Sequence, residues 1–131
     1  MTDKANKILI VEDEEALLEV LKERFEAEGF EVYISKDGED GLKVAIEKKP
    51  DIILLDIIMP KLDGLSMLKK LRQSEEGKNT RVVVLTNVND TKEVNEALAL
   101  GAKDFLVKSD WIISDLIVTV RKHLSEPLSF V

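Results

Sequence analysis

A short, unbroken apolar run at residues 52–55, reading Ile-Ile-Leu-Leu, constrains the fold of this chain most strongly. A run of this length without a polar interruption is typical of a strand in a parallel sheet whose two faces are both covered by helices. The run ends on Asp56, and the following segment, with Met-Pro at 59–60 and Asp-Gly at 63–64, has the composition of a loop. The pattern therefore places Asp56 where a central strand meets its loop, at the edge where open parallel sheets build their sites.

The same alternation of strand-like and helix-like segments continues along the chain. Further strands are predicted at residues 8–11, 31–35, 82–85 and 105–107. Apolar residues recur at helical spacing around residues 17–25, 42–46, 65–71, 94–98 and 111–124. Regular alternation with right-handed crossovers predicts an α/β fold: a doubly wound, flavodoxin-like sheet of five parallel strands in the order 2-1-3-4-5, with helices on both faces.

Length and composition limit the classes of function. The 131 residues predict a single domain over residues 1–131, with an ordered core at about 7–124 and a short tail at 125–131. The net charge of -7 would repel nucleic-acid backbones, so direct nucleic-acid binding is not expected. The absence of cysteine excludes disulfides and thiol nucleophiles. No signal peptide or membrane span is apparent in the sequence, so we expect a cytoplasmic location without membrane contact.

Polar residues stand where four of the predicted strands end. Glu12 and Asp13 follow the first strand, Asp56 ends the third, Thr86 ends the fourth and Lys108 follows the fifth. Each pair of neighbouring carboxylates would repel by roughly 4 kcal/mol at ~4 Å, so the acids need a cation, and oxygen ligands favour Mg²⁺ or Mn²⁺. A hydroxyl and an ammonium group beside such a metal suit phosphoryl oxygens. The edge of the sheet is therefore predicted to perform phosphoryl chemistry.

From about residue 7 to residue 124 the chain resembles the receiver domain of two-component response regulators, in particular the stand-alone type of chemotaxis and sporulation relays. The motifs that carry the resemblance are Val-Glu-Asp at 11–13, Asp-Ile-Ile-Met-Pro at 56–60 with Asp-Gly at 63–64, Leu-Thr at 85–86, and Gly-Ala-Lys-Asp-Phe-Leu-Val-Lys at 101–108. Jointly these motifs are highly specific for that family.

The resemblance implies how the phosphoryl group is received. Asp56 would accept it from a histidine kinase or a histidine phosphotransfer protein. Mg²⁺, with Mn²⁺ also suited, would be bound by Asp13, Asp56 and the backbone carbonyl of Ile58, and Glu12 would act through water. The chain would not be an enzyme beyond its own phosphorylation on Asp56 and slow autodephosphorylation.

The resemblance also implies how the signal leaves the site. Thr86 and Lys108 would hold the phosphoryl oxygens. Phe105 would be the switch aromatic, turning inward when the Thr86 hydroxyl moves toward the phosphoryl group. The fourth helix, fifth strand and fifth helix would then form the face that docks a downstream protein.

Two residues depart from the family pattern. Asn87 stands after the threonine, where most receivers have a small residue. Ser109 stands after Lys108, where the family usually has a proline, often with a cis bond. A cis bond without proline costs roughly 2.5 to 4 kcal/mol, so the Lys108–Ser109 peptide is predicted to be trans.

Other interpretations remain open at this point. The chain could be a receiver-like scaffold that works without phosphorylation, or, more distantly, a phosphohydrolase with an aspartate nucleophile, although Ile58 occupies the place of the usual general acid. A flavodoxin is excluded, because the acids at 12–15 would repel a phosphate. Taken singly, Asp63 fits a helix N-cap, Phe105 fits a core residue and His123 fits a helix end.

Overall fold

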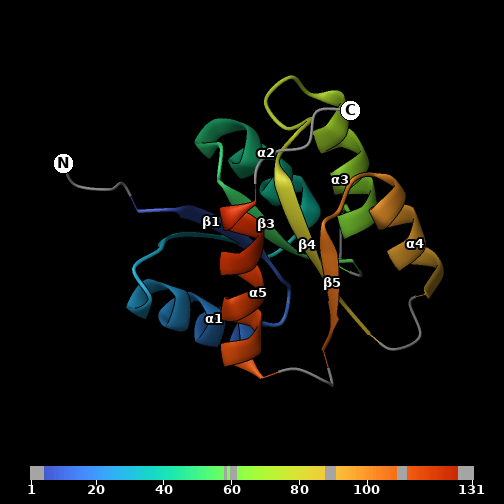
Figure 1. Cartoon of the computed structure of the whole chain (residues 1–131). Helices are drawn as coiled ribbons and strands as arrows, with labels where there is room; N and C mark the ends of the chain where they lie inside the picture. The colour runs from blue at the N-terminus through green and yellow to red at the C-terminus, as the bar shows by residue number, and fades with distance from the viewer. Residues whose placement is uncertain (1–4, 58, 60–61, 88–90, 109–111, 127–131) are drawn as a thin grey trace.

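The computed structural model describes residues 5–57, 59, 62–87, 91–108 and 112–126. Strands and helices alternate along this part of the chain (Figure 1). The strands are β1 (Lys7–Val11), β2 (Glu31–Ser35), β3 (Ile52–Asp56), β4 (Arg81–Thr86) and β5 (Asp104–Val107). The helices are α1 (Glu15–Ala27), α2 (Gly38–Lys48), α3 (Gly64–Gln73), α4 (Thr91–Ala99) and α5 (Ile113–Ser125).

The five strands form one parallel sheet in the order β2-β1-β3-β4-β5, which confirms the predicted topology. The chain starts in β1, moves outward to β2, and then crosses to the other side of β1 to form β3. The direction of winding therefore reverses between β1 and β3. A crevice at the carboxyl ends of the strands is expected where the strand order reverses in this way.

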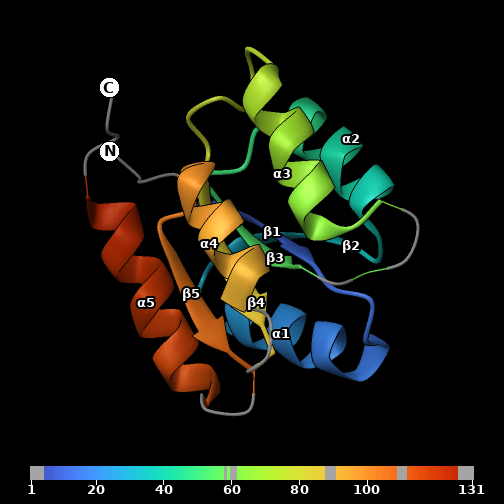
Figure 2. The same cartoon turned by 90° about the vertical axis from the view of Figure 1, so that its right-hand side faces the viewer.

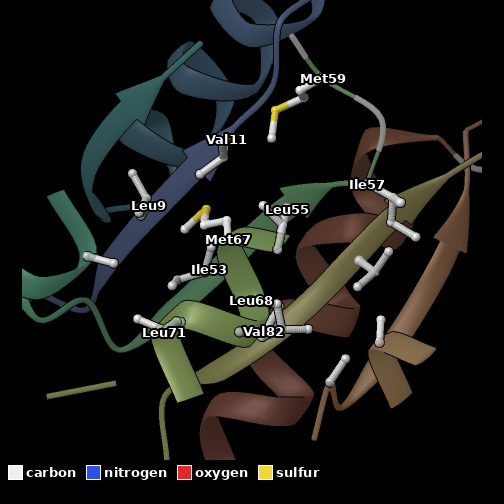
Figure 3. Packing of buried hydrophobic residues seen from close by; sticks show 14 of the residues in the cluster. Leu9, Val11, Ile53, Leu55, Ile57, Met59, Met67, Leu68, Leu71 and Val82 are labelled. Atoms are coloured by element: carbon white, nitrogen blue, oxygen red, sulfur yellow. The ribbon is translucent and has the colours of Figure 1, made fainter. Parts of the chain in front are cut away.

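Helices cover both faces of the sheet, and alternate strand residues supply the two cores. On one face, Ile53 and Leu55 of β3 belong to the cluster packed under α2, α3 and α4. Figure 3 shows Met67 and Leu68 of α3 close to them. On the other face, Ile52 and Leu54 belong to the cluster packed under α1 and α5. Both faces of β3 are therefore buried, as its continuous apolar run predicts.

The expected start of the last helix is wrong, and the alternative interpretation of Phe105 as a core residue is ruled out. The last helix begins at Ile113 rather than at 111, and Trp111 lies outside the described residues. Phe105 is 41% exposed and is no core residue, because β5 is an edge strand with a single neighbour. Leu98 is 39% exposed, since the buried stripe of α4 is centred on Val94 and Ala97.

Among the described residues, no helix has the length and apolar character needed to span a bilayer.

A half-buried arginine joins the carboxyl end of α3 to two loops. The Arg72 guanidinium donates to the carbonyl oxygens of Leu100 at 2.7 Å, Gly77 at 2.9 Å, Thr80 at 2.8 Å and Gly101 at 3.3 Å. Burial lowers the pKa of Arg72, but arginine keeps its charge in proteins. The side chain therefore ties the loop before β4 to the loop before β5 through charge-assisted hydrogen bonds.

His123 occupies the end of α5, as predicted, and is 7% exposed. Its Nε2 lies 3.1 Å from Asp104 Oδ2 at the start of β5, and its Nδ1 lies 2.7 Å from Glu126 Oε1. The ring therefore connects the end of the last helix to the edge strand.

Candidate functional site

The site lies where β1 and β3 end side by side. Val11 is paired with Leu55 in the parallel ladder, so the next residues, Glu12 and Asp56, leave the sheet next to each other. Backbone bonds hold both strand ends in place: Glu12 N–H donates to Ser35 O at 3.0 Å and Ile57 N–H donates to Leu85 O at 3.3 Å. The local sequence thus places these two carboxylates at the topological switch point of the sheet.

Three carboxylates meet at this position. Glu12, Asp13 and Asp56 each offer an oxygen, and the three oxygens lie within 4.8 Å of one another. Glu12 is 0% exposed and Asp56 is 3% exposed, whereas Asp13 is exposed to solvent. Carboxylate oxygens at this spacing are the donor set that Mg²⁺ or Mn²⁺ prefers, and an exposed Asp13 leaves the site open to water. The residues therefore fit a divalent cation.

Burial and the neighbouring Glu12 carboxylate raise the pKa of Asp56 from 3.8 to about 7, against the opposing effect of Lys108. The cause is physical: a buried anion loses its hydration, and a second anion beside it adds repulsion. A cation bound among these oxygens would favour the ionised form of Asp56.

Lys108 contacts both buried acids. Its Nζ lies 2.8 Å from Glu12 Oε1 and 3.0 Å from Asp56 Oδ2. Partial burial acts to lower the pKa of Lys108, but the hydrogen bonds and charges of Glu12 and Asp56 outweigh it and raise the pKa. Lys108 N–H also donates to Thr86 O at 2.7 Å, which continues the β4–β5 pairing by one residue. The ammonium group is thereby held over the carboxylate that ends β3.

Thr86 ends the strand next to β3 and borders a groove beside α4. Its side chain is buried at the end of β4, and its hydroxyl donates to the carbonyl oxygen of Asn87 at 3.1 Å. Thr86 also lines a cavity of about 140 Å³ together with Val94, Leu98 and Phe105. Asn87 is exposed. Thr86 thus belongs both to the end of β4 and to the groove that contains Phe105.

Other residues from the sequence analysis fall outside the acidic cluster. Asp63 is the N-cap of α3, where its Oδ1 accepts the N–H of Ser66 at 2.8 Å, as predicted. Ile58 and Ser109 lie outside the described residues, so the metal role of the Ile58 carbonyl and the trans Lys108–Ser109 peptide stay predictions.

One buried residue near the site was missed by the sequence analysis. A Cβ atom on Gly38, at the start of α2, would lie 1.9 Å from the carbonyl oxygen of Leu62 in the segment that follows Asp56. The only local signal is a glycine directly after Asp37, the N-cap residue of α2. That signal gives no indication of which distant segment lies against Gly38.

The fold and the site together define a doubly wound α/β domain with a carboxylate cluster and a lysine at the switch point of its sheet. Residues 8–120 match the sequence model of the response regulator receiver domain. The chain belongs to this family and is a receiver domain of two-component response regulators. Receiver domains accept a phosphoryl group on an aspartate with Mg²⁺, and they are signalling modules rather than classical enzymes.

Several similar proteins support this assignment. The alkaline phosphatase synthesis transcriptional regulatory protein PhoP of Bacillus subtilis is 39% identical over 102 residues, which cover 78% of this chain and 42% of PhoP. The chain therefore spans about two fifths of the length of that relative. The Francisella response regulator 1452 receiver domain is 32% identical, with a TM-score of 0.81, over 91% of this chain and 96% of that one.

A third similar structure bears on the metal. The receiver domain of the sensor histidine kinase PA1611 of Pseudomonas aeruginosa was solved with a magnesium ion coordinated in its active-site cleft. It is 25% identical, with a TM-score of 0.84, over 94% of this chain and 100% of that one.

Proposed function

We propose that Asp56 is the phosphoacceptor of this receiver domain. The observation that carries the proposal is the position of its carboxylate: 3% exposed, within 4.8 Å of the acids of Glu12 and Asp13, and 3.0 Å from the Lys108 ammonium. A strand-end carboxylate between a metal-binding cluster and a fixed cation suits nucleophilic attack on phosphorus. Glu12 shares the burial and the Lys108 contact, so the choice of Asp56 also rests on its place as the first residue of the Asp-Ile-Ile-Met-Pro motif at 56–60.

The chemistry is a transfer from a phosphohistidine of a histidine kinase or a histidine phosphotransfer protein. An Asp56 oxygen forms a new bond to phosphorus while the phosphorus–nitrogen bond breaks, and the released imidazole nitrogen retains the bonding pair and takes up a proton. Mg²⁺, or Mn²⁺, held by Asp13, Asp56 and the Ile58 carbonyl, with Glu12 acting through water, would supply charge neutralisation. Lys108 moves its ammonium contact from the carboxylates to a phosphoryl oxygen.

We also propose that phosphorylation changes a docking face. The Thr86 hydroxyl exchanges its bond to the Asn87 carbonyl for one to the phosphoryl group, which makes room for Phe105 to turn inward. The face consists of α4, β5 and α5, and β5 lies between the two helices (Figure 2). Three apolar side chains on it are exposed: Leu98 at 39%, Phe105 at 41% and Val118 at 66%. A downstream protein would bind there, in the cytoplasm as the sequence leads us to expect.

Acetyl phosphate provides a test without a partner protein. Incubation with acetyl phosphate and Mg²⁺ should add the mass of one phosphoryl group, as measured by intact-protein mass spectrometry, and Asp56→Asn should abolish the addition. Asp63→Asn is the matched control, because asparagine caps a helix as well as aspartate does. The phosphorylated protein should lose its group slowly, without sustained turnover of acetyl phosphate. Undiminished labelling of Asp56→Asn would show that another residue is the acceptor.

The same assay separates the two alternative functions. A receiver-like scaffold that works without phosphorylation would show no labelling of the wild type. A phosphohydrolase would release inorganic phosphate continuously, at a rate that scales with enzyme concentration.

A further inference from the structure

The first turn of α2 lies against the segment that leads into α3. Gly38 is the first residue of α2 and is buried. A Cβ atom at this position would lie 1.9 Å from Leu62 O, 2.8 Å from Leu62 C and 3.2 Å from Asp63 O. These are backbone atoms, which cannot rotate away as the end of a long side chain can. The two helix N-termini are therefore in direct backbone contact through a position that has no side chain.

The start of α3 is in turn packed on the end of β3. Gly64 N–H donates to Ile57 O at 2.8 Å, and a Cβ atom on Gly64 would lie 2.1 Å from Asp56 O. The N-cap bond of Asp63 to Ser66 fixes the orientation of this turn. A continuous set of backbone contacts thus runs from Gly38 through Leu62 and Gly64 to the main chain of Asp56.

We propose that Gly38 is a positioning residue for the phosphoacceptor Asp56, an inference that rests on the proposed function of that residue. The contact at Gly38 sets how closely α2 approaches the start of α3. The contact at Gly64 in turn fixes the Asp56 backbone relative to the start of α3. The carboxylate of Asp56 must meet the oxygens of Glu12 and Asp13 within 4.8 Å to share a metal. Gly38 acts through backbone packing and touches neither the metal site nor the phosphoryl group.

Adding one methyl group at this position gives a measurable displacement. Leu62 O and a new Cβ would have to separate by roughly 1.5 Å to reach an ordinary contact distance. A displacement of about 1 Å at reacting groups can reduce a rate by about 10²-fold. Part of the movement will be absorbed by α2, so Gly38→Ala is expected to slow phosphorylation of Asp56 by about 10-fold or more.

Gly41→Ala supplies a matched control on the same helix. A Cβ atom at Gly41 would meet Val11 Cγ2 at 3.0 Å and Met67 Sδ at 3.1 Å, which are side-chain atoms of the apolar core. This substitution therefore tightens the packing of α2 without pressing on the segment after Asp56. It should leave the phosphorylation rate within about 2-fold of wild type, whatever it does to stability.

The experiment measures three quantities for wild type, Gly38→Ala and Gly41→Ala. These are the rate of phosphorylation by acetyl phosphate at saturating Mg²⁺, the Mg²⁺ affinity by calorimetry, and the free energy of unfolding by urea denaturation. Rates are expressed per folded molecule, and trimethylamine N-oxide, which favours the compact state, is added to all samples if Gly38→Ala is partly unfolded. We expect a slower phosphorylation rate and a weaker Mg²⁺ affinity for Gly38→Ala alone.

Each other outcome has a distinct meaning. A wild-type rate in folded Gly38→Ala would overturn the positioning role while leaving the proposed function intact. Slowing of both variants in proportion to their loss of stability would also overturn it, because general loosening would then explain the effect. Failure of the wild type itself to be phosphorylated would refute the proposed function, and this inference with it.

Discussion

Asp56→Asn should stabilise the metal-free protein at alkaline pH, even though it removes the proposed phosphoacceptor. The Asp56 carboxylate is 3% exposed and faces the buried Glu12 carboxylate, and these two effects raise its pKa from 3.8 to about 7. Ionising it in the folded protein therefore costs more free energy than ionising it in the unfolded chain. Asparagine has nearly the same shape and carries no charge, so it avoids that cost.

The magnitude and the sign follow from linkage. Because the pKa of Asp56 is higher in the folded protein, the folded protein binds more protons than the unfolded chain between pH 3.8 and about 7. The stability of the wild type should therefore fall as the pH rises through this window. At about 1.36 kcal/mol per pKa unit, the cost is about 4 kcal/mol at pH 8 and only about 1 kcal/mol at pH 4.5. The contact with Lys108 is already included in the raised pKa.

Urea denaturation in EDTA at pH 4.5 and pH 8 measures this effect. The stability gain of Asp56→Asn over wild type should be about 2–4 kcal/mol at pH 8 and should shrink several-fold at pH 4.5. Glu19→Gln, an equal charge change at an exposed position on α1, should alter stability by less than about 0.5 kcal/mol at both pH values. A gain independent of pH, or a less stable variant at pH 8, would refute the reasoning that burial and the Glu12 carboxylate make ionised Asp56 unfavourable.

Three further predictions concern the metal, the switch and the loops. Asp13→Ala should bind Mg²⁺ at least about 10-fold more weakly in calorimetry, since it removes a carboxylate of the cluster; equal affinity would place Asp13 outside the metal shell. Beryllofluoride, a phosphoryl mimic, should shift the NMR amide signals of α4 and Phe105, whereas shifts confined to the surroundings of Asp56 would contradict a switch. Arg72→Met should lower the free energy of unfolding by about 2–4 kcal/mol, because partly buried carbonyl oxygens lose a charged donor. Lys70→Met, exposed on the same helix, should change stability by less than about 0.5 kcal/mol in the same denaturation experiment.

The sheet was predictable because each of its strands has a recognisable local sequence pattern. The apolar run at 52–55 can be buried on both faces only in the middle of a parallel sheet, and β3 is indeed buried throughout. The carboxylate cluster was predictable for the same reason, since parallel strands bring their carboxyl ends to one edge and thereby collect Glu12, Asp13 and Asp56. The family motifs added the chemistry to this geometry.

Contacts that depend on side-chain direction or on distant segments were not predictable. The approach of Lys108 to both Glu12 and Asp56 depends on how a long, flexible side chain settles between two acids. The exposure of Phe105 follows from the limited cover over an edge strand, which residue type alone does not report. The contact of Gly38 with Leu62 joins segments separated along the chain, and glycine leaves no periodic pattern that indicates its partner.

The burial of His123 determines whether this histidine can receive a phosphoryl group. His123 is the single histidine of the sequence, and its two ring nitrogens lie 3.1 Å and 2.7 Å from the carboxylates of Asp104 and Glu126. An imidazole that is 7% exposed and flanked by two acids is a poor acceptor for a dianionic phosphoryl group, which needs open access and positive surroundings. Within residues 1–131, a phosphoryl group on Asp56 therefore has no histidine suited to receive it.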